Sequence, residues 1–397
     1  MRQLLFVLGV LLAASGAARA QWDLEDSHST ADLRGIDNVG GGVAWASGNN
    51  GTVLRTEDGG YLWQTCSIPP GAEHLDFRGI QAFDANTAIV MSSGKGDLSR
   101  LYKTTDGCQT WKLVWQNHVP DGFYDAFWMN DFGREAMLIG DPVEDRFTVL
   151  RSKDGGATWT RDRSASLRLR GRSIAAFAAS NNALGRGLRG DGDTRGPGED
   201  FFPGFVTGGK DGSFLVERWE GPSHSKARHG RGLPGGPPPD WNWRSIPLAT
   251  GTESTGAFAL SLRSTGSPCE DCGFRAYWRL VTVGGDFAKP DERAGTAAFS
   301  VDGGWTWAAS TTPPHGYRSA VAYDPASKTW ITVGPNGTDI STDDGKDWRA
   351  VHPDPALHEA PDADRNWNAL SLPFVVGPHG RIGKLNPHAL APGRSDP

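Results

Sequence analysis

The feature that most constrains this chain is an eight-residue motif, Ser/Thr-x-Asp-x-x-x-x-Trp, which occurs five times. Gly usually follows the Asp directly. The Asp carboxylate can accept hydrogen bonds from backbone N–H groups of a tight turn, and Gly supplies the positive φ that the reversal needs. The Trp ring is expected to pack beside the next unit. The motif therefore predicts a recurring β-hairpin turn, and its aspartates are expected to be structural and not catalytic.

Turns of this kind are called Asp-boxes. The five copies place their aspartate and tryptophan at Asp58 and Trp63, Asp106 and Trp111, Asp154 and Trp159, Asp302 and Trp307, and Asp343 and Trp348. The long interval between the third and fourth copies leaves room for two further repeats whose boxes have decayed.

A second marker supports that count. An apolar run that ends in glycine recurs seven times, at Gly48, Gly94, Gly140, Gly208, Gly284, Gly334 and Gly377. Each unit reads as four short strands, and units of about 54 residues with four strands are typical of propeller blades. The sequence therefore predicts an all-β fold, a seven-bladed β-propeller with four-stranded antiparallel blades.

The last unit, from Asn366 to about Leu385, supplies only three strands. The segment around Trp22 precedes the first inner strand and can provide the missing outer strand. We expect this N-terminal strand to close the ring, because an open ring would leave two unpaired sheet edges.

The sequence also indicates where the domain begins and ends and where it carries insertions. Residues 1–20 combine Arg2, a short apolar run and Ala18-Arg19-Ala20, which is the pattern of a cleaved export signal. We expect the propeller to occupy residues 21–390, with mobile insertions at about 184–203, 222–240 and 264–275 and a disordered tail at 391–397. The product is then expected to be periplasmic or secreted.

Charge and cysteine content narrow the partners. Without Arg2 and Arg19 the chain has 38 basic residues against 46 acidic ones, which argues against general attraction to nucleic acid or anionic membrane. No stable membrane insertion, cofactor or metal site is predicted, and a monomer is expected. The four cysteines, Cys66, Cys108, Cys269 and Cys272, could form two disulfides. Cys269 and Cys272 lie in a Gly/Pro/Ser-rich loop, where a structural bridge or free thiols are favoured over redox chemistry.

The pattern from Leu33 to Gly60, with Leu-Arg-Gly-Ile at 33–36 and Gly-Asn-Asn-Gly-Thr at 48–52, resembles the photosystem II assembly and stability factor family. The resemblance covers essentially the whole chain after residue 20. It implies a seven-bladed exported propeller that acts as a binding scaffold without a cofactor.

The resemblance also implies a partner surface of arginines at the starts of inner strands. The matching positions are Arg34, Arg78, Arg172 and Arg318, whereas Asp125, Thr255 or Gly256, and Asn368 stand near the equivalent places in other blades. Guanidinium groups on one face would bind carboxylates of a protein or peptide. The alternative is that each arginine is held by a neighbouring carboxylate, such as Asp125, as internal structure.

A glycoside hydrolase is the second hypothesis, because sialidases also use Asp-box propellers. Such an enzyme needs a pair of carboxylates or a Tyr-Glu pair at the same face. The candidates are Asp125, Glu253, Tyr124 and Tyr317. Sialidases usually have an Arg-Ile-Pro segment at the first blade, and this sequence has none there. The binding scaffold is therefore the preferred hypothesis.

Overall fold

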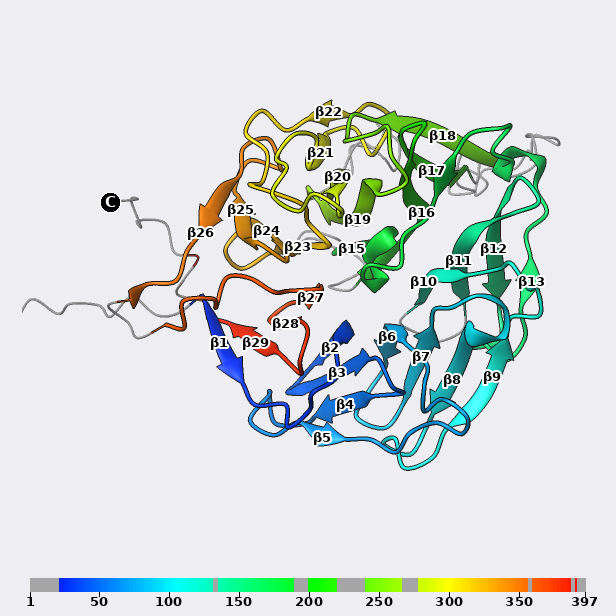
Figure 1. Cartoon of the computed structure of the whole chain (residues 1–397), viewed down its shortest axis with the longest axis vertical. Coiled ribbons are helices and arrows are strands. Elements are labelled where there is room, and N and C mark those ends of the chain that lie inside the picture. Colours follow the sequence, from blue (N-terminus) through cyan, green and yellow to red (C-terminus); the bar gives the residue numbers. More distant parts are fainter. Residues whose placement is uncertain are drawn as a thin grey trace, which may run out of the picture.

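The computed structural model describes residues 21–130, 135–188, 199–219, 240–265, 278–355, 359–386 and 390. Within these residues the strands form seven blades around a central axis, and the inner strands of the blades surround the centre of the ring (Figure 1). The expected insertions at about 184–203, 222–240 and 264–275 lie largely outside the described residues, as do residues 1–20, 391–397, Cys269 and Cys272. Strands do reach into the first of these insertions.

The blades follow one another along the chain. Blade 1 is β2 (Leu33–Gly40), β3 (Val43–Gly48), β4 (Val53–Thr56) and β5 (Gln64–Thr65). Blade 2 is β6 (Phe77–Ala82), β7 (Ala88–Ser92), β8 (Arg100–Thr104) and β9 (Lys112–Gln116). Blade 3 is β10 (Tyr124–Met129), β11 (Ala136–Val143), β12 (Arg146–Ser152) and β13 (Thr160–Arg161). Blade 4 is β14 (Ile174–Ala175), β16 (Glu199–Gly209), β17 (Ser213–Trp219) and β18 (Asp240–Ile246). Blade 5 is β19 (Thr255–Ser264), β20 (Trp278–Asp286), β21 (Ala297–Ser300) and β22 (Ala308–Ala309). Blade 6 is β23 (Ala320–Asp324), β24 (Thr329–Gly334), β25 (Gly337–Ser341) and β26 (Arg349–Val351).

Blade 7 confirms the predicted closure. It consists of β27 (Ala369–Ser371), β28 (Phe374–Val376), β29 (Ile382–Leu385) and the N-terminal β1 (Trp22–Glu25), which lies beside β29 in Figure 1. The strands β1 and β29 pair antiparallel, with Trp22 opposite Leu385. The Trp22 side chain is buried against Trp367, with ring centroids 6.1 Å apart. The two ends of the domain therefore share one sheet, in which β1 is the outer strand and covers the edge of β29.

Blades 4 and 5 depart from the expected pattern of separate four-stranded sheets. An additional strand, β15 (Leu184–Leu188), pairs antiparallel with β16 and parallel with β19. It joins the two blades into one continuous sheet of nine strands within the described residues. The strand comes from the chain that follows the short inner strand β14, in the region expected to be a loop. The expected pattern of four strands per blade did not predict a strand that pairs with two blades.

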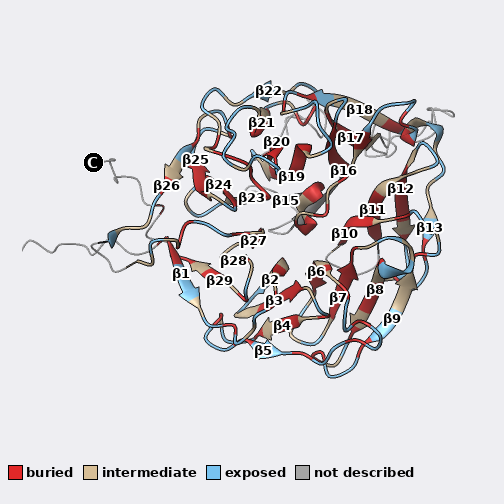
Figure 2. Ribbon diagram, in the orientation of Figure 1, coloured by how far each residue is buried: buried red, intermediate tan, exposed pale blue. Residues whose placement is uncertain are grey.

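The hydrophobic core lies between blades. Within the described residues it divides into seven clusters, and each combines side chains of two neighbouring blades. Figure 2 shows the same arrangement as buried inner strands and exposed outer edges. The Asp-box tryptophans belong to these clusters, but they pack against the preceding blade and not the next one as expected. Trp63 of blade 1, for example, packs edge-on against Phe374 of blade 7, with centroids 5.5 Å apart.

The five Asp-box turns share one hydrogen-bond pattern. In blade 1 the Thr56 hydroxyl donates to Asp58 Oδ1 at 2.8 Å and accepts from the Gly60 N–H, while Asp58 Oδ1 accepts from the Leu62 N–H at 3.0 Å. The four other boxes repeat these bonds. Hydrogen bonds from the Thr110 hydroxyl and backbone N–H lower the pKa of Asp106 to about 2. The Asp106 carboxylate thus stays ionised as an acceptor that holds its turn.

The marker glycines lie in the second strand of each blade or within two residues of its end. A Cβ at Gly48, Gly140, Gly284, Gly334 or Gly377 would collide with a backbone carbonyl oxygen beside the start of an inner strand. These oxygens belong to Asp32, Phe123, Gly256, Tyr317 and Asn366, respectively. Glycine is therefore required by close backbone approach, which explains why this marker recurs even in blades 4 and 7, where no Asp-box motif is found.

Candidate functional site

The inner strands begin at one face of the ring, here called the upper face, and the Asp-box turns lie at the opposite face. In blades 1, 2, 3 and 5 the pairing of the inner strand with the second strand skips one residue near the upper face. The skipped residues are Arg34, Arg78, Asp125 and Phe258. A residue in such a β-bulge is unpaired, and its side chain is re-aimed relative to the regular alternation.

The remaining blades can be aligned by register. The pairs Ala320 with Val333 and Ala369 with Val376 place Ser319 and Asn368 at the position of the bulge, and Ala175 opposite Gly208 places Ala176 there. We call these seven residues the axial ring: Arg34, Arg78, Asp125, Ala176, Phe258, Ser319 and Asn368. The sequence alignment had matched Arg34, Arg78, Asp125 and Asn368 correctly, but it had placed the other three blades out of register.

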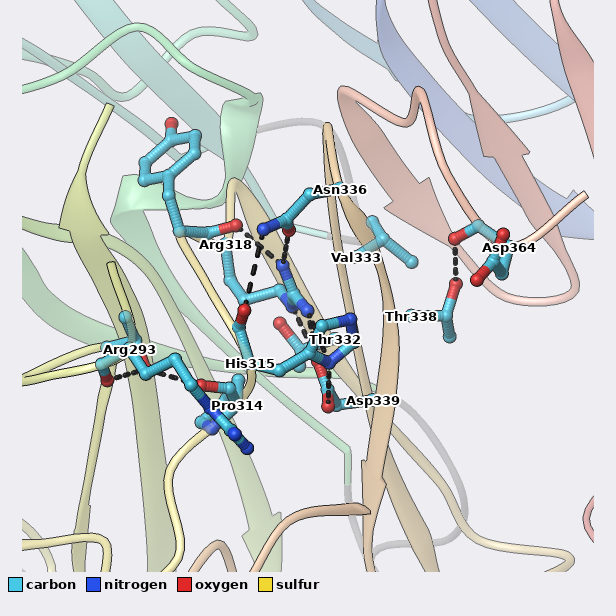
Figure 3. Close-up of polar contacts among 12 residues, drawn as sticks. Arg293, Pro314, His315, Arg318, Thr332, Val333, Asn336, Thr338, Asp339 and Asp364 are labelled. Carbon is cyan, nitrogen blue, oxygen red and sulfur yellow. Dashed lines mark hydrogen bonds and ion pairs between the residues drawn. The ribbon is translucent and has the colours of Figure 1, made fainter. Parts of the chain in front are cut away.

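Arg318 was expected to line the partner surface, and the structure places it elsewhere. It precedes the ring residue Ser319 by one position, so alternation turns its side chain away, and the guanidinium is 0% exposed. Figure 3 shows it enclosed by polar groups of blade 6 and of the loop before it. Its Nε donates to Asp339 Oδ2 at 2.8 Å and its Nη1 donates to the Asn336 side chain at 2.5 Å. Arg318 is therefore internal structure and is not available to a partner.

The carboxylate that holds Arg318 has a second donor. His315 Nδ1 lies 2.7 Å from Asp339 Oδ1. Burial by itself would raise the pKa of Asp339, but the hydrogen bond from His315 and the charge of Arg318 lower it below its usual value. Arg318 and Asp339 thus form an ionised, fully enclosed pair. For Arg318 this matches the alternative in which a neighbouring carboxylate holds the arginine as internal structure.

Arg172 is also separate from the axial ring. It lies four residues before Ala176 and is exposed. Its guanidinium carbon lies 5.5 Å from the ring centroid of Phe214 and 5.6 Å from that of Trp243, both in outer strands of blade 4. The structure therefore does not bring the four predicted arginines together.

Arg34 and Arg78 do come together, at a carboxylate that the sequence analysis missed. Asp76 lies between blades 1 and 2, and its Oδ1 is 3.3 Å from Arg34 Nε. Its Oδ2 accepts from Arg78 Nε at 2.8 Å. The side chains of Arg34 and Arg78 are 30% and 29% exposed. Two guanidinium groups therefore share the single carboxylate of Asp76.

The channel itself is crossed by the segment 176–183, which we call the plug. The Ala178 carbonyl accepts from Arg78 Nη1 at 3.2 Å, and the Asn181 side chain accepts from the Phe127 N–H at 2.9 Å. On the other side of the ring, the Ser180 hydroxyl donates to the Ser319 carbonyl at 2.9 Å. The plug thus contacts blades 2, 3 and 6.

Asp125 forms a buried carboxyl pair with Asp141 of the adjacent strand. Burial raises the pKa of Asp125 well above its usual value, and the charge of Asp141 adds to this while Arg78 opposes it. Burial also raises the pKa of Asp141 to about 6. Among the described residues, Asp125 Oδ2 and Asp141 Oδ1 have no hydrogen-bond partner. A proton on the pair is therefore favoured at mildly acidic pH.

This pair predicts a pH dependence of stability. A carboxyl group with a raised folded-state pKa binds its proton more tightly in the folded state, so stability is present at low pH and is lost as pH rises toward the folded pKa. Between pH 4.5 and 7.5 the pair is expected to cost about 2 kcal/mol of unfolding free energy. Urea unfolding across that range measures this loss. The Asp141→Asn variant should show a flatter profile, and an unchanged slope would contradict the assignment.

The residues proposed for a glycoside hydrolase lie in different environments. Glu253 is 79% exposed and forms an ion pair with Lys210 at 2.9 Å. Tyr317 is buried, and burial raises the pKa of its hydroxyl. Tyr124 is buried too, with its hydroxyl accepting from Trp115 Nε1 at 2.8 Å. Asp125 and Tyr317 are therefore enclosed, whereas Glu253 faces solvent.

Cysteine and metal chemistry are limited in the part of the chain that the structure describes. Cys66 and Cys108 form a disulfide between the end of blade 1 and the Asp-box turn of blade 2. The candidate pair Cys269 and Cys272 lies outside the described residues. No group of three or more metal-ligating side chains occurs among the described residues, and none of their helices is long and apolar enough to cross a membrane.

The described residues form a seven-bladed propeller in which Arg34 and Arg78 of two neighbouring blades pair with Asp76. In comparisons with known proteins, no family model and no curated protein matches the chain. Solved structures do match. A structure titled YCF48 bound to D1 peptide is 18% identical, covers 92% of this chain and 96% of its own, and has a TM-score of 0.54. YCF48 from Cyanidioschyzon merolae is 17% identical, covers 93% of this chain and 99% of its own, and has a TM-score of 0.53.

YCF48 is a photosystem II assembly factor, so this likeness confirms the predicted fold resemblance. A xyloglucanase of family GH74 from Xanthomonas campestris also matches, with 16% identity over 78% of this chain and 47% of its own. Its TM-score is 0.31, and no argument is based on it.

Proposed function

We propose that this chain is an exported, non-catalytic binding scaffold that holds an acidic group of a protein or peptide partner at Arg34 and Arg78. The observation that carries the proposal is the convergence of these two guanidinium groups on Asp76 at the mouth of the channel. The fold likeness to YCF48 supports a peptide as partner, because one YCF48 structure is titled as bound to a D1 peptide.

The chemistry of the arginine pair fits a carboxylate ligand. Arg34 uses only Nε toward Asp76, and no acceptor among the described residues is bonded to its terminal nitrogens. Arg78 uses Nε and Nη1. Guanidinium groups bind carboxylates through parallel N–H donors, and a second carboxylate would balance the remaining positive charge. The partner would therefore dock by an acidic side chain or a chain terminus.

The disulfide supports the export part of the proposal. Cys66 and Cys108 are bonded within the domain core, and such bonds persist mainly in oxidising compartments. Export agrees with the signal pattern of residues 1–20, which lie outside the described residues. Sequencing the N-terminus of the protein recovered from the exported fraction tests this part directly.

Partner capture tests the binding site. Wild-type protein and the Arg34→Glu/Arg78→Glu variant are used to capture partners from the native exported fraction, with Arg172→Glu as the matched control because Arg172 lies on blade 4 outside the axial ring. Wild type and Arg172→Glu should retain the same partner, and the double variant should lose it at least tenfold. Equal recovery by a folded double variant, checked by its melting temperature, would remove this site assignment.

A further inference from the structure

The axial ring is charged on one side and aromatic on another. Phe258 of blade 5 occupies the bulge position that Arg34 and Arg78 occupy in blades 1 and 2. Its ring stacks on Phe177 with centroids 3.9 Å apart and contacts Tyr317 edge-on at 4.9 Å. Phe287, at the end of blade 5's second strand, lies edge-on to Phe258 at 6.0 Å. We call these four residues the aromatic platform.

The platform is open to solvent on one side. Phe287 is 52% exposed, and Phe177 is half-buried. The Phe287 N–H donates to the Ser254 carbonyl at 3.2 Å, which ties its loop to the start of blade 5. Large apolar side chains held exposed by ordered backbone are typical of binding surfaces, because their burial by a partner is favourable. The exposed ring is thus positioned before any partner arrives.

The platform borders the arginine pair. Phe177 is followed directly by Ala178, whose carbonyl accepts from Arg78 Nη1. The positive charge of Arg78 also acts on the Tyr317 hydroxyl and favours its ionised form, although burial raises the pKa overall. Adjacent residues of the plug therefore contact the cationic and the aromatic parts of the ring.

We infer that the partner segment is amphipathic: it carries a carboxylate for Arg34 and Arg78 and, within a few residues of that group, an aromatic or branched apolar side chain for the aromatic platform. This inference rests on the proposed function, because the carboxylate anchors the segment. The charges of Arg34 and Arg78 favour a segment with an acidic group. The exposed ring of Phe287 favours an apolar side chain close to that group.

Two matched sets of labelled synthetic peptides test the inference. All end in a free carboxylate, and one set carries Phe at one to five residues before it, whereas the other carries Ser at the same places. In fluorescence anisotropy, wild-type protein should bind the best Phe peptide about tenfold more tightly than its Ser counterpart. Phe287→Ser should remove this preference, so that the Phe and Ser peptides bind with equal affinity. Tyr61→Ser is the control, because Tyr61 is an exposed ring on an Asp-box turn of blade 1.

The outcomes separate the two levels of the proposal. Equal affinity for both sets, abolished by Arg34→Glu, would overturn the aromatic platform and leave the proposed function standing. A Phe preference that survives Phe287→Ser would also overturn the platform. Absence of binding by wild type, or binding unaffected by Arg34→Glu, would contradict the carboxylate site and the platform together.

Discussion

Replacing Asp339 by asparagine is expected to lower the free energy of unfolding by about 3–5 kcal/mol. The substitution leaves the shape of the side chain nearly unchanged, but it strips Arg318 of the carboxylate that balances a guanidinium with no solvent exposure. A buried charge without its partner carries the desolvation cost without the compensating attraction. Urea unfolding, followed by tryptophan fluorescence, measures the loss.

Two further variants show whether the charge is the cause. Asp121→Asn removes an exposed carboxylate and should change stability by less than about 0.5 kcal/mol. Arg318→Met combined with Asp339→Leu removes both charges and should recover much of the loss. If Asp339→Asn were as stable as wild type, Arg318 could not be the enclosed, paired residue described above.

Removing the disulfide is expected to cost about 4 kcal/mol. The bond between Cys66 and Cys108 closes a loop with a sequence separation of 42, and the entropy of that loop in the unfolded chain gives this magnitude. The bond also connects two neighbouring blades. Beside it, the Ser67 hydroxyl donates to the Cys108 carbonyl at 2.7 Å, which is a second contact between these blades. The unfolding free energy of a Cys66→Ala/Cys108→Ala variant measures the effect.

Backbone conformation needs a separate control at this position. Cys108 has a φ of 63° and stands where Gly60 and Gly156 stand in the other boxes, so an alanine there carries its own strain. Cys66→Ala/Cys108→Gly removes the bond without that strain and should recover only about 1 kcal/mol. Reduction of the disulfide in the wild-type protein should lower its free energy of unfolding by about as much as the Cys66→Ala/Cys108→Gly substitutions do. Equal stability of the oxidised and reduced protein would contradict the bond's contribution.

The repeat pattern predicted the fold because its signals are local. Each Asp-box is a turn closed by its own side chains, and most marker glycines are fixed by a close backbone approach. The N-terminal closure followed from a missing fourth strand in the last unit. Blade 4 was less predictable, since its inner strand β14 has only two residues and the chain then leaves the sheet to form the plug and β15.

The site was predicted only in part, because it depends on register. Arg34 and Arg78 occupy the ring positions expected for them, but a shift of one residue separates Arg318 from the ring position held by Ser319, and that shift decides whether the side chain is buried. Asp76, Asp141 and the plug contacts arise from tertiary packing, for which the sequence carries no local signal.

The central claim is that the activity of this propeller resides at the arginine pair of its upper face. The most direct measurement is a crystal structure of the protein with the partner segment recovered by capture. The account predicts a carboxylate of that segment within hydrogen-bond distance of both Arg34 and Arg78. A segment bound to the outer strands or to the Asp-box face, with no carboxylate of the segment at Arg34 or Arg78, would contradict this assignment.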